Sequence, residues 1–149
     1  MSWRAITDDD VFSALNSAEE AAVRQELLVE GQEDPLATVI AQVTLEVREA
    51  IRSCAGNRLH SEPTCVPDGA IRHAVAIIRH RLLTRFDAGA IGEARLMEYR
   101  EAHRYLEAVA ACKRAVESPD EGEDAIAPVT MPRVTARERQ FTRESQDGI

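Results

Sequence analysis

The apolar residues between positions 34 and 55 recur at spacings of three and four, and this period constrains the fold more than any other feature. The positions are Leu36, Ile40, Val43, Val47 and Ile51. Because an α-helix turns once every 3.6 residues, they share one face, which must be buried against other elements. Asp34 is a capping residue and Pro35 suits the first turn, so a helix is predicted from there to about Ala55, with Gly56 as its stop.

Four further helices are expected from similar signals. They span about Asp8–Leu15, Ser17 to near Gly31, Ala70–Phe86 and Glu93–Val116. Thr7 would cap the first, Ser17 and Glu20 have capping-box spacing, and Pro119 ends the last. The apolar face of residues 70–86 is broad, which predicts a centrally packed helix. No window alternates as an exposed strand would, so the predicted class is all-α, a bundle of about four to five helices.

Residues 118–149 turn polar and charge-segregated after the helical pattern. The segment begins acidic and ends basic around a lone Phe141, with arginines at Arg133, Arg137, Arg139 and Arg143. It cannot bury enough apolar surface to fold alone, so we predict an extended or disordered C-terminal arm after a helical domain over residues 1–117. These four arginines and Phe141 are the predicted partner-binding site, with the arginines pairing with acidic groups of a neighbouring copy. The alternative is a dispensable disordered tail.

The charge of the chain is acidic overall and unevenly spread. With 18 basic and 26 acidic residues the net charge is −8, which argues against a surface wholly devoted to nucleic acid. Residues 1–50 hold 11 acidic residues and 3 arginines, whereas residues 51–117 hold 11 basic against 8 acidic. This division suits identical subunits that meet head to tail, although an ordinary charged surface explains it equally well.

The cysteines and the N-terminal residues indicate the cellular compartment in which the protein is made. Cys54, Cys65 and Cys112 are sparse, odd in number and form no CxxC pair, which fits a reducing compartment. The start of the chain lacks the apolar run of a signal peptide, and no segment reaches the roughly 18 apolar residues that span a bilayer. We therefore expect a soluble protein made in a cytoplasm, with no membrane partner.

No set of residues predicts a catalytic centre, a cofactor site or a metal site. A set of Cys54, His60, Cys65 and His73 matches no familiar zinc spacing. His73 and His80 are expected on the face opposite Ile71 and Ile78, towards solvent or a neighbour. There is no glycine-rich phosphate loop and no serine nucleophile motif, so an enzyme is not expected.

Two other functions stay open from the residues. Glu46, Glu49, Glu98 and Glu101 could serve an all-α metal-dependent nucleotide hydrolase, although they stand among arginines and solvated helix faces explain them more simply. The basic second half could serve a helical DNA-binding regulator, with salt-dependent affinity for duplex.

Five short patterns follow one another along nearly the whole chain. They are Trp3 with Thr7, Asp8, Asp9, Asp10 and Val11; Glu49–Ile51 with Ala55–Arg58; Pro67 with Ala74, Ile78, Arg79 and Leu82; Tyr99 with Ala102 and Leu106; and Arg139–Ser145. In this order and spacing the chain resembles the small Mu-like phage neck proteins, which are head-to-tail connectors and head completion proteins. The chain departs from the family at Leu59, where an aromatic residue is common. Cys112 and Lys113 replace a glycine after the last helix, so that helix is expected to continue further.

The resemblance implies a structural role in a tailed bacteriophage. It implies a homo-oligomeric ring, commonly of twelve copies, that docks under the portal protein in the virion neck. The ring would continue the DNA channel towards a downstream neck or tail-completion protein, and DNA would pass without sequence recognition. Synthesis would take place in the cytoplasm of the host bacterium.

Overall fold

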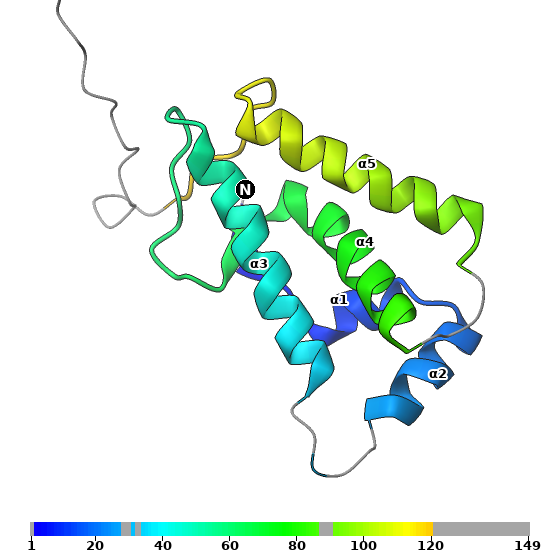
Figure 1. Cartoon of the computed structure of the whole chain (residues 1–149). Coiled ribbons are helices and arrows are strands. Elements are labelled where there is room, and N and C mark those ends of the chain that lie inside the picture. Colours follow the sequence, from blue (N-terminus) through cyan, green and yellow to red (C-terminus); the bar gives the residue numbers. More distant parts are fainter. Residues whose placement is uncertain (1, 28–30, 32–33, 87–90, 121–149) are drawn as a thin grey trace, which may run out of the picture.

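The computed structural model describes residues 2–27, 31, 34–86 and 91–120, which form a helical body with one small sheet (Figure 1). The elements are β1 (Trp3–Ala5), α1 (Asp8–Ser13), α2 (Ser17–Leu27), α3 (Pro35–Ser53), β2 (Cys65–Pro67), α4 (Asp68–Arg85) and α5 (Glu93–Ala110). The predicted mostly helical class is confirmed, with five helices in the described part of the chain.

Helix α4 is the centre of the body. It contacts α3 and α5 along its length and also α1, α2 and β2. Figure 1 shows it between α3 and α5. Ala74, Ile77, Ile78 and Leu82 are fully buried, so its apolar side chains reach well around the helix. The central position predicted from this breadth is confirmed.

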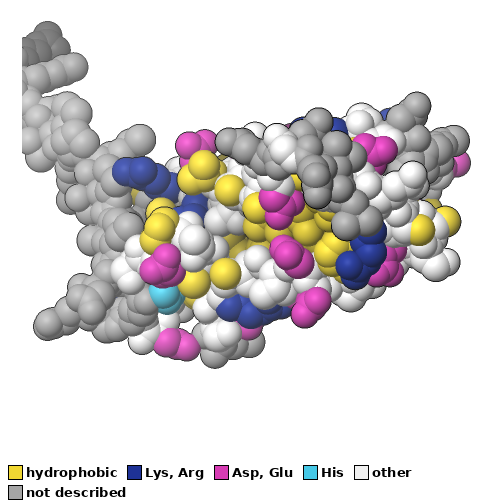
Figure 2. Space-filling model, turned by 90° about the horizontal axis from the view of Figure 1, so that it is seen from below, with side chains coloured by type: hydrophobic (Ala, Val, Ile, Leu, Met, Phe, Trp, Pro, Cys, Tyr) yellow, Lys and Arg dark blue, Asp and Glu magenta, His cyan; other side chains and the backbone are white. Residues whose placement is uncertain are grey.

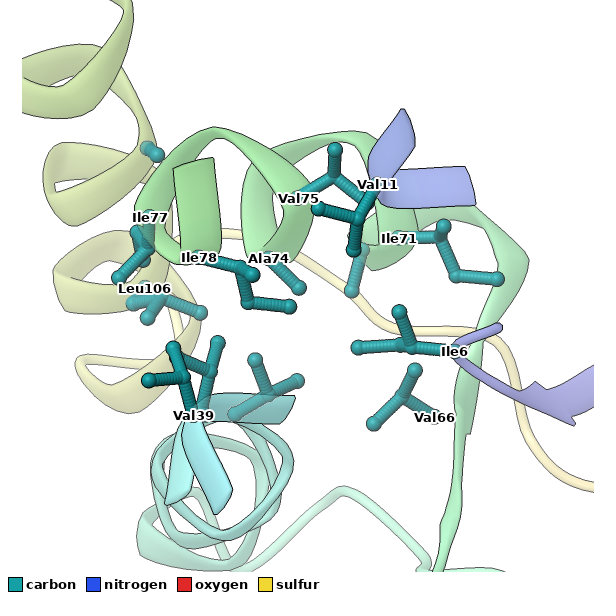
Figure 3. Close-up of a cluster of buried hydrophobic side chains, with 14 of the residues drawn as sticks. Ile6, Val11, Val39, Val66, Ile71, Ala74, Val75, Ile77, Ile78 and Leu106 are labelled. Atoms are coloured by element: carbon teal, nitrogen blue, oxygen red, sulfur yellow. The ribbon is translucent and has the colours of Figure 1, made fainter. Parts of the chain in front are cut away.

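The hydrophobic core lies where α3, α4 and α5 meet, and it continues to the sheet. Figure 3 shows Val39, Ile78 and Leu106, one from each of these helices, pointing towards a common centre. Ile6 and Val66 close the core beside the sheet. Full burial of one such side chain stabilises the fold by about 1.5 to 3 kcal/mol, which explains why helices of modest length hold together.

Two of the predicted helix starts are confirmed in detail. At α1, Thr7 Oγ1 accepts a hydrogen bond from Asp10 N at 3.3 Å, and Asp10 Oδ2 accepts one from Thr7 N at 2.8 Å. At α3, Asp34 Oδ1 accepts a hydrogen bond from Leu36 N at 2.9 Å, and Pro35 fills the first turn. Both arrangements satisfy N–H groups that the first helical turn leaves without a partner.

The predicted capping box of α2 is displaced by one residue. Asn16 and Glu19 form it, with Asn16 Oδ1 accepting from Glu19 N and Glu19 Oε2 accepting from Asn16 N, each at 2.9 Å. Ser17 is the first residue of the helix instead of its cap. Asparagine caps helices as well as serine does, so Asn16 and Ser17 are both suitable caps, and Asn16 is the one used.

The small sheet is a feature that the sequence did not predict. Its two strands are antiparallel and pair Trp3 with Pro67, Arg4 with Val66 and Ala5 with Cys65. Asp68 N donates a hydrogen bond to Ser2 O at 3.1 Å, which extends the connection into the start of α4. Strands of three residues are too short to show an alternating pattern, so the sequence carries no signal for them.

The connection between α3 and β2 is held by the buried guanidinium of Arg48. Its Nη1 donates to Glu62 O at 3.0 Å and to Cys65 O at 2.8 Å, and its Nη2 donates to His60 O at 2.9 Å. Burial lowers the pKa of Arg48, but arginine titrates so far above neutrality that the side chain stays charged.

Helix α5 ends at Ala110, earlier than the predicted end near Val116. Cys112 has a φ of 58°, which is the left-handed conformation that glycine commonly adopts after a helix. Lys113 N and Arg114 N then both donate to Ala108 O, at 2.9 and 3.2 Å, and the chain turns away from the helix axis. The expectation that the helix continues is therefore wrong, because Cys112 takes the backbone conformation of the glycine that it replaces.

Cys54 and Cys112 form a disulfide, with their Cα atoms 5.3 Å apart. It joins the end of α3 to the residue after α5 across 58 positions of sequence. Cys65 is the free cysteine. Nothing in the sequence indicated this bond, because the spacing of cysteines along the chain carries no signal for so distant a pair.

None of the helices that the structure describes is both long and apolar enough to cross a membrane.

Candidate interaction surfaces

An open groove of about 750 Å³ lies over α4, between α1 and α5. Its charged and polar walls are Arg4, Asp10, Asp68, Arg72, His73, Arg79, Glu98 and Glu101. Its other lining residues, Ala14, Ile71, Val75 and Ala76, are apolar, so the groove combines charges of both signs with apolar surface, as protein interfaces do.

At the first end of the groove Arg4 binds two carboxylates. Its Nη1 and Nη2 fork onto Asp10 at 2.7 and 2.9 Å, and its Nε lies 3.3 Å from Asp68 Oδ1. The hydrogen bond from Arg4 holds the pKa of Asp10 well below its usual range, against a smaller opposing effect of burial and with help from Thr7. The cluster ties β1 to the N-terminal turns of α1 and α4.

At the other end Arg79 connects three helices from a buried position. Its Nη1 donates to Ala14 O, at the end of α1, over 3.0 Å, and its Nη2 pairs with Glu98 of α5. Burial is the main cause that lowers the pKa of Arg79, and Arg95 adds to the effect. Arg95 extends the network to α2, since its Nη2 lies 3.1 Å from Glu19 Oε2.

Two stacked pairs of histidine and tyrosine join α4 to α5. The rings of His73 and Tyr105 are 4.0 Å apart, and those of His80 and Tyr99 are 3.9 Å apart. His73 was expected towards solvent or a neighbour; it is only 6% exposed, so it does not face solvent. Helix α5 covers that side of α4, which a helical wheel of α4 alone cannot reveal.

The residues weighed as metal ligands have other contacts. Glu46 Oε2 accepts a hydrogen bond from Arg81 at 2.8 Å, and Glu98 pairs with Arg79. Cys54 is in the disulfide, and His73 is stacked on Tyr105. Among the described residues no group of three or more histidine, cysteine, aspartate or glutamate side chains could hold a metal ion. The structure thus brings together neither the four glutamates nor the cysteine and histidine set.

The predicted partner-binding residues Arg133, Arg137, Arg139, Phe141 and Arg143 lie outside the described residues. The predicted domain boundary between residues 117 and 118 stays a prediction, because most of the arm that follows it lies outside the described residues. The structure does place residues 111–120, which we call the C-terminal strap. Trp3 Nε1 donates a hydrogen bond to Glu117 O at 3.0 Å, and Pro119 is buried. The strap therefore returns to the body beside β1.

Exposed apolar side chains offer further contact area. Leu45 of α3 is 59% exposed and Met97 of α5 is 62% exposed. Figure 2 shows hydrophobic side chains gathered in the middle of the lower face, with acidic and basic side chains around them. An apolar centre with a charged rim is the usual composition of a protein interface.

Sequence reasoning missed the charged groove, although it had singled out some of its residues. Asp10 and Arg79 belong to the patterns quoted for the family resemblance, where they appeared as part of a helix start and of a helix face. Their partners, Arg4, Ala14 and Glu98, come from other elements. Only the packing of those elements reveals that these residues share one groove.

Comparison with known proteins identifies the family. The family model described as Bacteriophage Mu, Gp36 matches residues 4–132, which is most of the chain. The match covers all five helices, while the closing pattern Arg139–Ser145 lies beyond it. No curated protein and no solved structure matches the chain significantly. The predicted likeness to Mu-like phage proteins is thereby confirmed, and the chain belongs to the Bacteriophage Mu, Gp36 family of phage structural and morphogenesis proteins.

Proposed function

We propose that this protein is a head-to-tail connector, or adaptor, of a tailed bacteriophage. It forms a homo-oligomeric ring under the portal protein in the virion neck and continues the DNA channel towards a downstream neck or tail-completion protein. The observation that carries the proposal is the family match over residues 4–132, together with the ordered patterns that resemble Mu-like neck proteins.

The surface of the body supports a ring of identical subunits. A closed ring needs two different contact surfaces on each copy, because the front of one subunit meets the back of the next. The charged groove over α4 and the exposed side chains of Leu45 and Met97 provide surfaces of different character. The networks around Arg4 and Arg79 hold the groove in shape before any partner arrives.

The C-terminal arm supports contacts between subunits or with the portal. Its arginines would pair with carboxylates of a neighbouring copy, and the exposed Asp8 and Asp9 at the start of α1 are suitable partners. Phe141 would enter an apolar groove as an anchor. Arginine suits this task because its planar guanidinium forks onto a carboxylate.

The overall charge supports passage of DNA without sequence recognition. A net charge of −8 repels the phosphate backbone on average, whereas proteins that grip DNA neutralise phosphates with clustered basic residues. An adaptor that surrounds moving DNA benefits from weak attachment.

The test is assembly on the purified portal protein, observed by electron microscopy. The full chain is expected to form a ring on the portal, and its absence from the portal and from the neck of purified particles would refute the proposal. An all-α hydrolase would instead bind magnesium or manganese in calorimetry.

A shortened chain that ends at Asp120 tests the role of the arm. It keeps the strap and its contact with Trp3, so its unfolding temperature is expected to stay within about 2 °C of the full chain. Assembly on the portal is expected to be lost. A shortened chain that assembles normally would show that the arm is not a binding element.

A further inference from the structure

The two bonded cysteines lie at the base of the C-terminal strap. Cys54 follows the last turn of α3, and Cys112 is the second residue after α5. From Cys112 the chain leads to Glu117, whose carbonyl accepts the hydrogen bond from Trp3, and to the buried Pro119. The disulfide is therefore the covalent link at the point where the chain leaves the helical body for the arm.

The two cysteine residues differ in exposure. Cys54 is 6% exposed and belongs to the core, whereas Cys112 is exposed. An attacking reagent in solution thus reaches Cys112 first. Thiol–disulfide exchange proceeds by attack of a thiolate on a disulfide sulfur through a mixed disulfide, and its rate depends on this access.

We propose that Cys54 and Cys112 form a reversible dithiol–disulfide site that exchanges with small disulfides of the glutathione class, and that oxidation fastens the strap to the body. The Cys112 thiolate attacks one sulfur of oxidised glutathione, which forms a mixed disulfide and releases one glutathione thiolate. The Cys54 thiolate then attacks the sulfur of Cys112 and expels the second glutathione. Two protein thiols are oxidised, oxidised glutathione is reduced to two molecules of glutathione, and the two thiol protons end on these products.

The disulfide adds a covalent link to the non-covalent contacts that hold the strap. These contacts include the hydrogen bonds from Lys113 N and Arg114 N to Ala108 O, the packing of Val116 on the core, the hydrogen bond from Trp3 Nε1 to Glu117 O, the burial of Pro119 and the position of the Arg114 guanidinium over Tyr105 at 4.7 Å. A single hydrogen bond adds little net stability, since water replaces it when the strap leaves. The left-handed φ of Cys112 is also unfavourable for a residue other than glycine, so the reduced chain gains by relaxing there.

The redox environment of a phage protein becomes less reducing when the particle leaves the cell, and this change favours oxidation of the two cysteines. Bacterial cytoplasm keeps thiols reduced, and the medium outside the lysed cell does not. The strap would thus be loosely held while the protein is made and fixed in the released particle. This timing rests on the proposed function, whereas the exchange reaction at the two cysteines does not.

The chain contains convenient reporters for an experiment on the full-length protein. Trp3 is the single tryptophan, so its fluorescence reports whether the strap covers it. Lys113 and Arg114 place two trypsin cleavage sites in the strap, and Arg104 within α5 provides an internal reference site. The protein is compared after treatment with dithiothreitol and with oxidised glutathione, and its free thiols are counted.

With oxidised glutathione, one free thiol per chain is expected, against three after reduction. Reduction is expected to speed cleavage after Lys113 and Arg114 about tenfold relative to cleavage after Arg104, and to move the Trp3 emission to longer wavelength. Three thiols that persist in oxidised glutathione, or equal relative cleavage and equal emission in both states, would overturn the proposal.

Three variants separate the disulfide from the other effects. Cys65→Ser should respond to the reagents as the natural chain does, because Cys65 is outside the bond. Cys112→Ser and Cys112→Gly both remove the bond, but only glycine favours the left-handed backbone. Both should behave like the reduced chain in either reagent. A redox response that survives in both variants would overturn the assignment to this pair. Failure to assemble on the portal would leave these measurements unaffected.

Discussion

Arg79 has more influence on the helical body than its single side chain suggests, because it holds the end of α1 and the side of α5 to the central helix. Its Nη1 bonds to Ala14 O, and its Nη2 pairs with Glu98. The sequence placed Arg79 in one of the helical patterns that carry the family resemblance, but gave no sign that it is buried. Its partners lie 65 and 19 positions away, beyond the reach of a local pattern.

Replacement of Arg79 by methionine is expected to lower the free energy of unfolding by about 2 kcal/mol, because the Ala14 carbonyl loses its donor and Glu98 keeps only Arg95. Urea denaturation measures the effect. Arg104→Met is the matched control on an exposed helix face, where a change within about 0.5 kcal/mol is expected. Equal stability of the two variants would contradict the role assigned to Arg79.

The buried His73 makes stability depend on pH. Burial lowers its pKa below the ordinary value of 6.5, and Arg72 and Arg114 lower it further while Glu101 opposes them. The unfolded chain therefore binds the proton at His73 more readily than the folded protein does. The stability that the neutral His73 contributes is fully present above pH 6.5, and it is lost as the pH falls from there through the folded-state pKa. Denaturation midpoints at pH 7.5 and 5.5 measure this loss. In His73→Phe, which keeps a ring against Tyr105, the difference between the two midpoints should shrink, and an unchanged difference would exclude His73 as its cause.

At the scale of elements, helices with strong periodicity were predicted well and their ends less well. The start of α3 was predicted correctly because Asp34 and Pro35 are unambiguous. The start of α2 at Ser17 was predicted correctly, but its capping box lies one residue earlier than expected, because Asn16 and Ser17 are both good caps. The end of α5 was misplaced because Cys112 adopts a conformation that its side chain disfavours, which no local propensity indicates.

The cap of α2 can be tested with two adjacent substitutions. Asn16→Ala removes the oxygen that accepts from Glu19 N, so a loss of about 1 kcal/mol in the free energy of unfolding is expected. Ser17→Ala changes the first residue of the helix and is expected to have almost no effect. Thermal unfolding of both variants decides between them, and a larger effect at Ser17 would restore the capping box expected from the sequence.

At the scale of the whole molecule, the sequence predicted the fold class and the family, while the connections between distant segments came only from the structure. The disulfide, the two short strands and the contact of Trp3 with the strap all join residues far apart in the chain. Local patterns determine helices, but such pairings depend on how the helices pack. The predicted site in the arm stays a prediction, since it lies outside the described residues.

The proposed anchor in the arm makes a prediction about assembly. Phe141→Ala should weaken assembly on the portal by about 2 to 4 kcal/mol, the range of a buried interface anchor. Titration of the portal with labelled protein measures the change. Thr142→Ala, which removes only a hydroxyl and a methyl group from the next position, is the control, and equal affinities for the two variants would exclude Phe141 as an anchor.

The hydrogen bonds from Arg48 to the connection before β2 affect which residues of this loop can vary within the family. The guanidinium binds carbonyl oxygens of His60, Glu62 and Cys65, which every amino acid carries. The exposed side chains of Glu62 and Thr64, which bond to each other at 3.2 Å, can therefore be exchanged while these contacts of Arg48 are retained. A phage lineage could thus alter the chemistry of this loop to follow a changing partner, without altering the body that presents it.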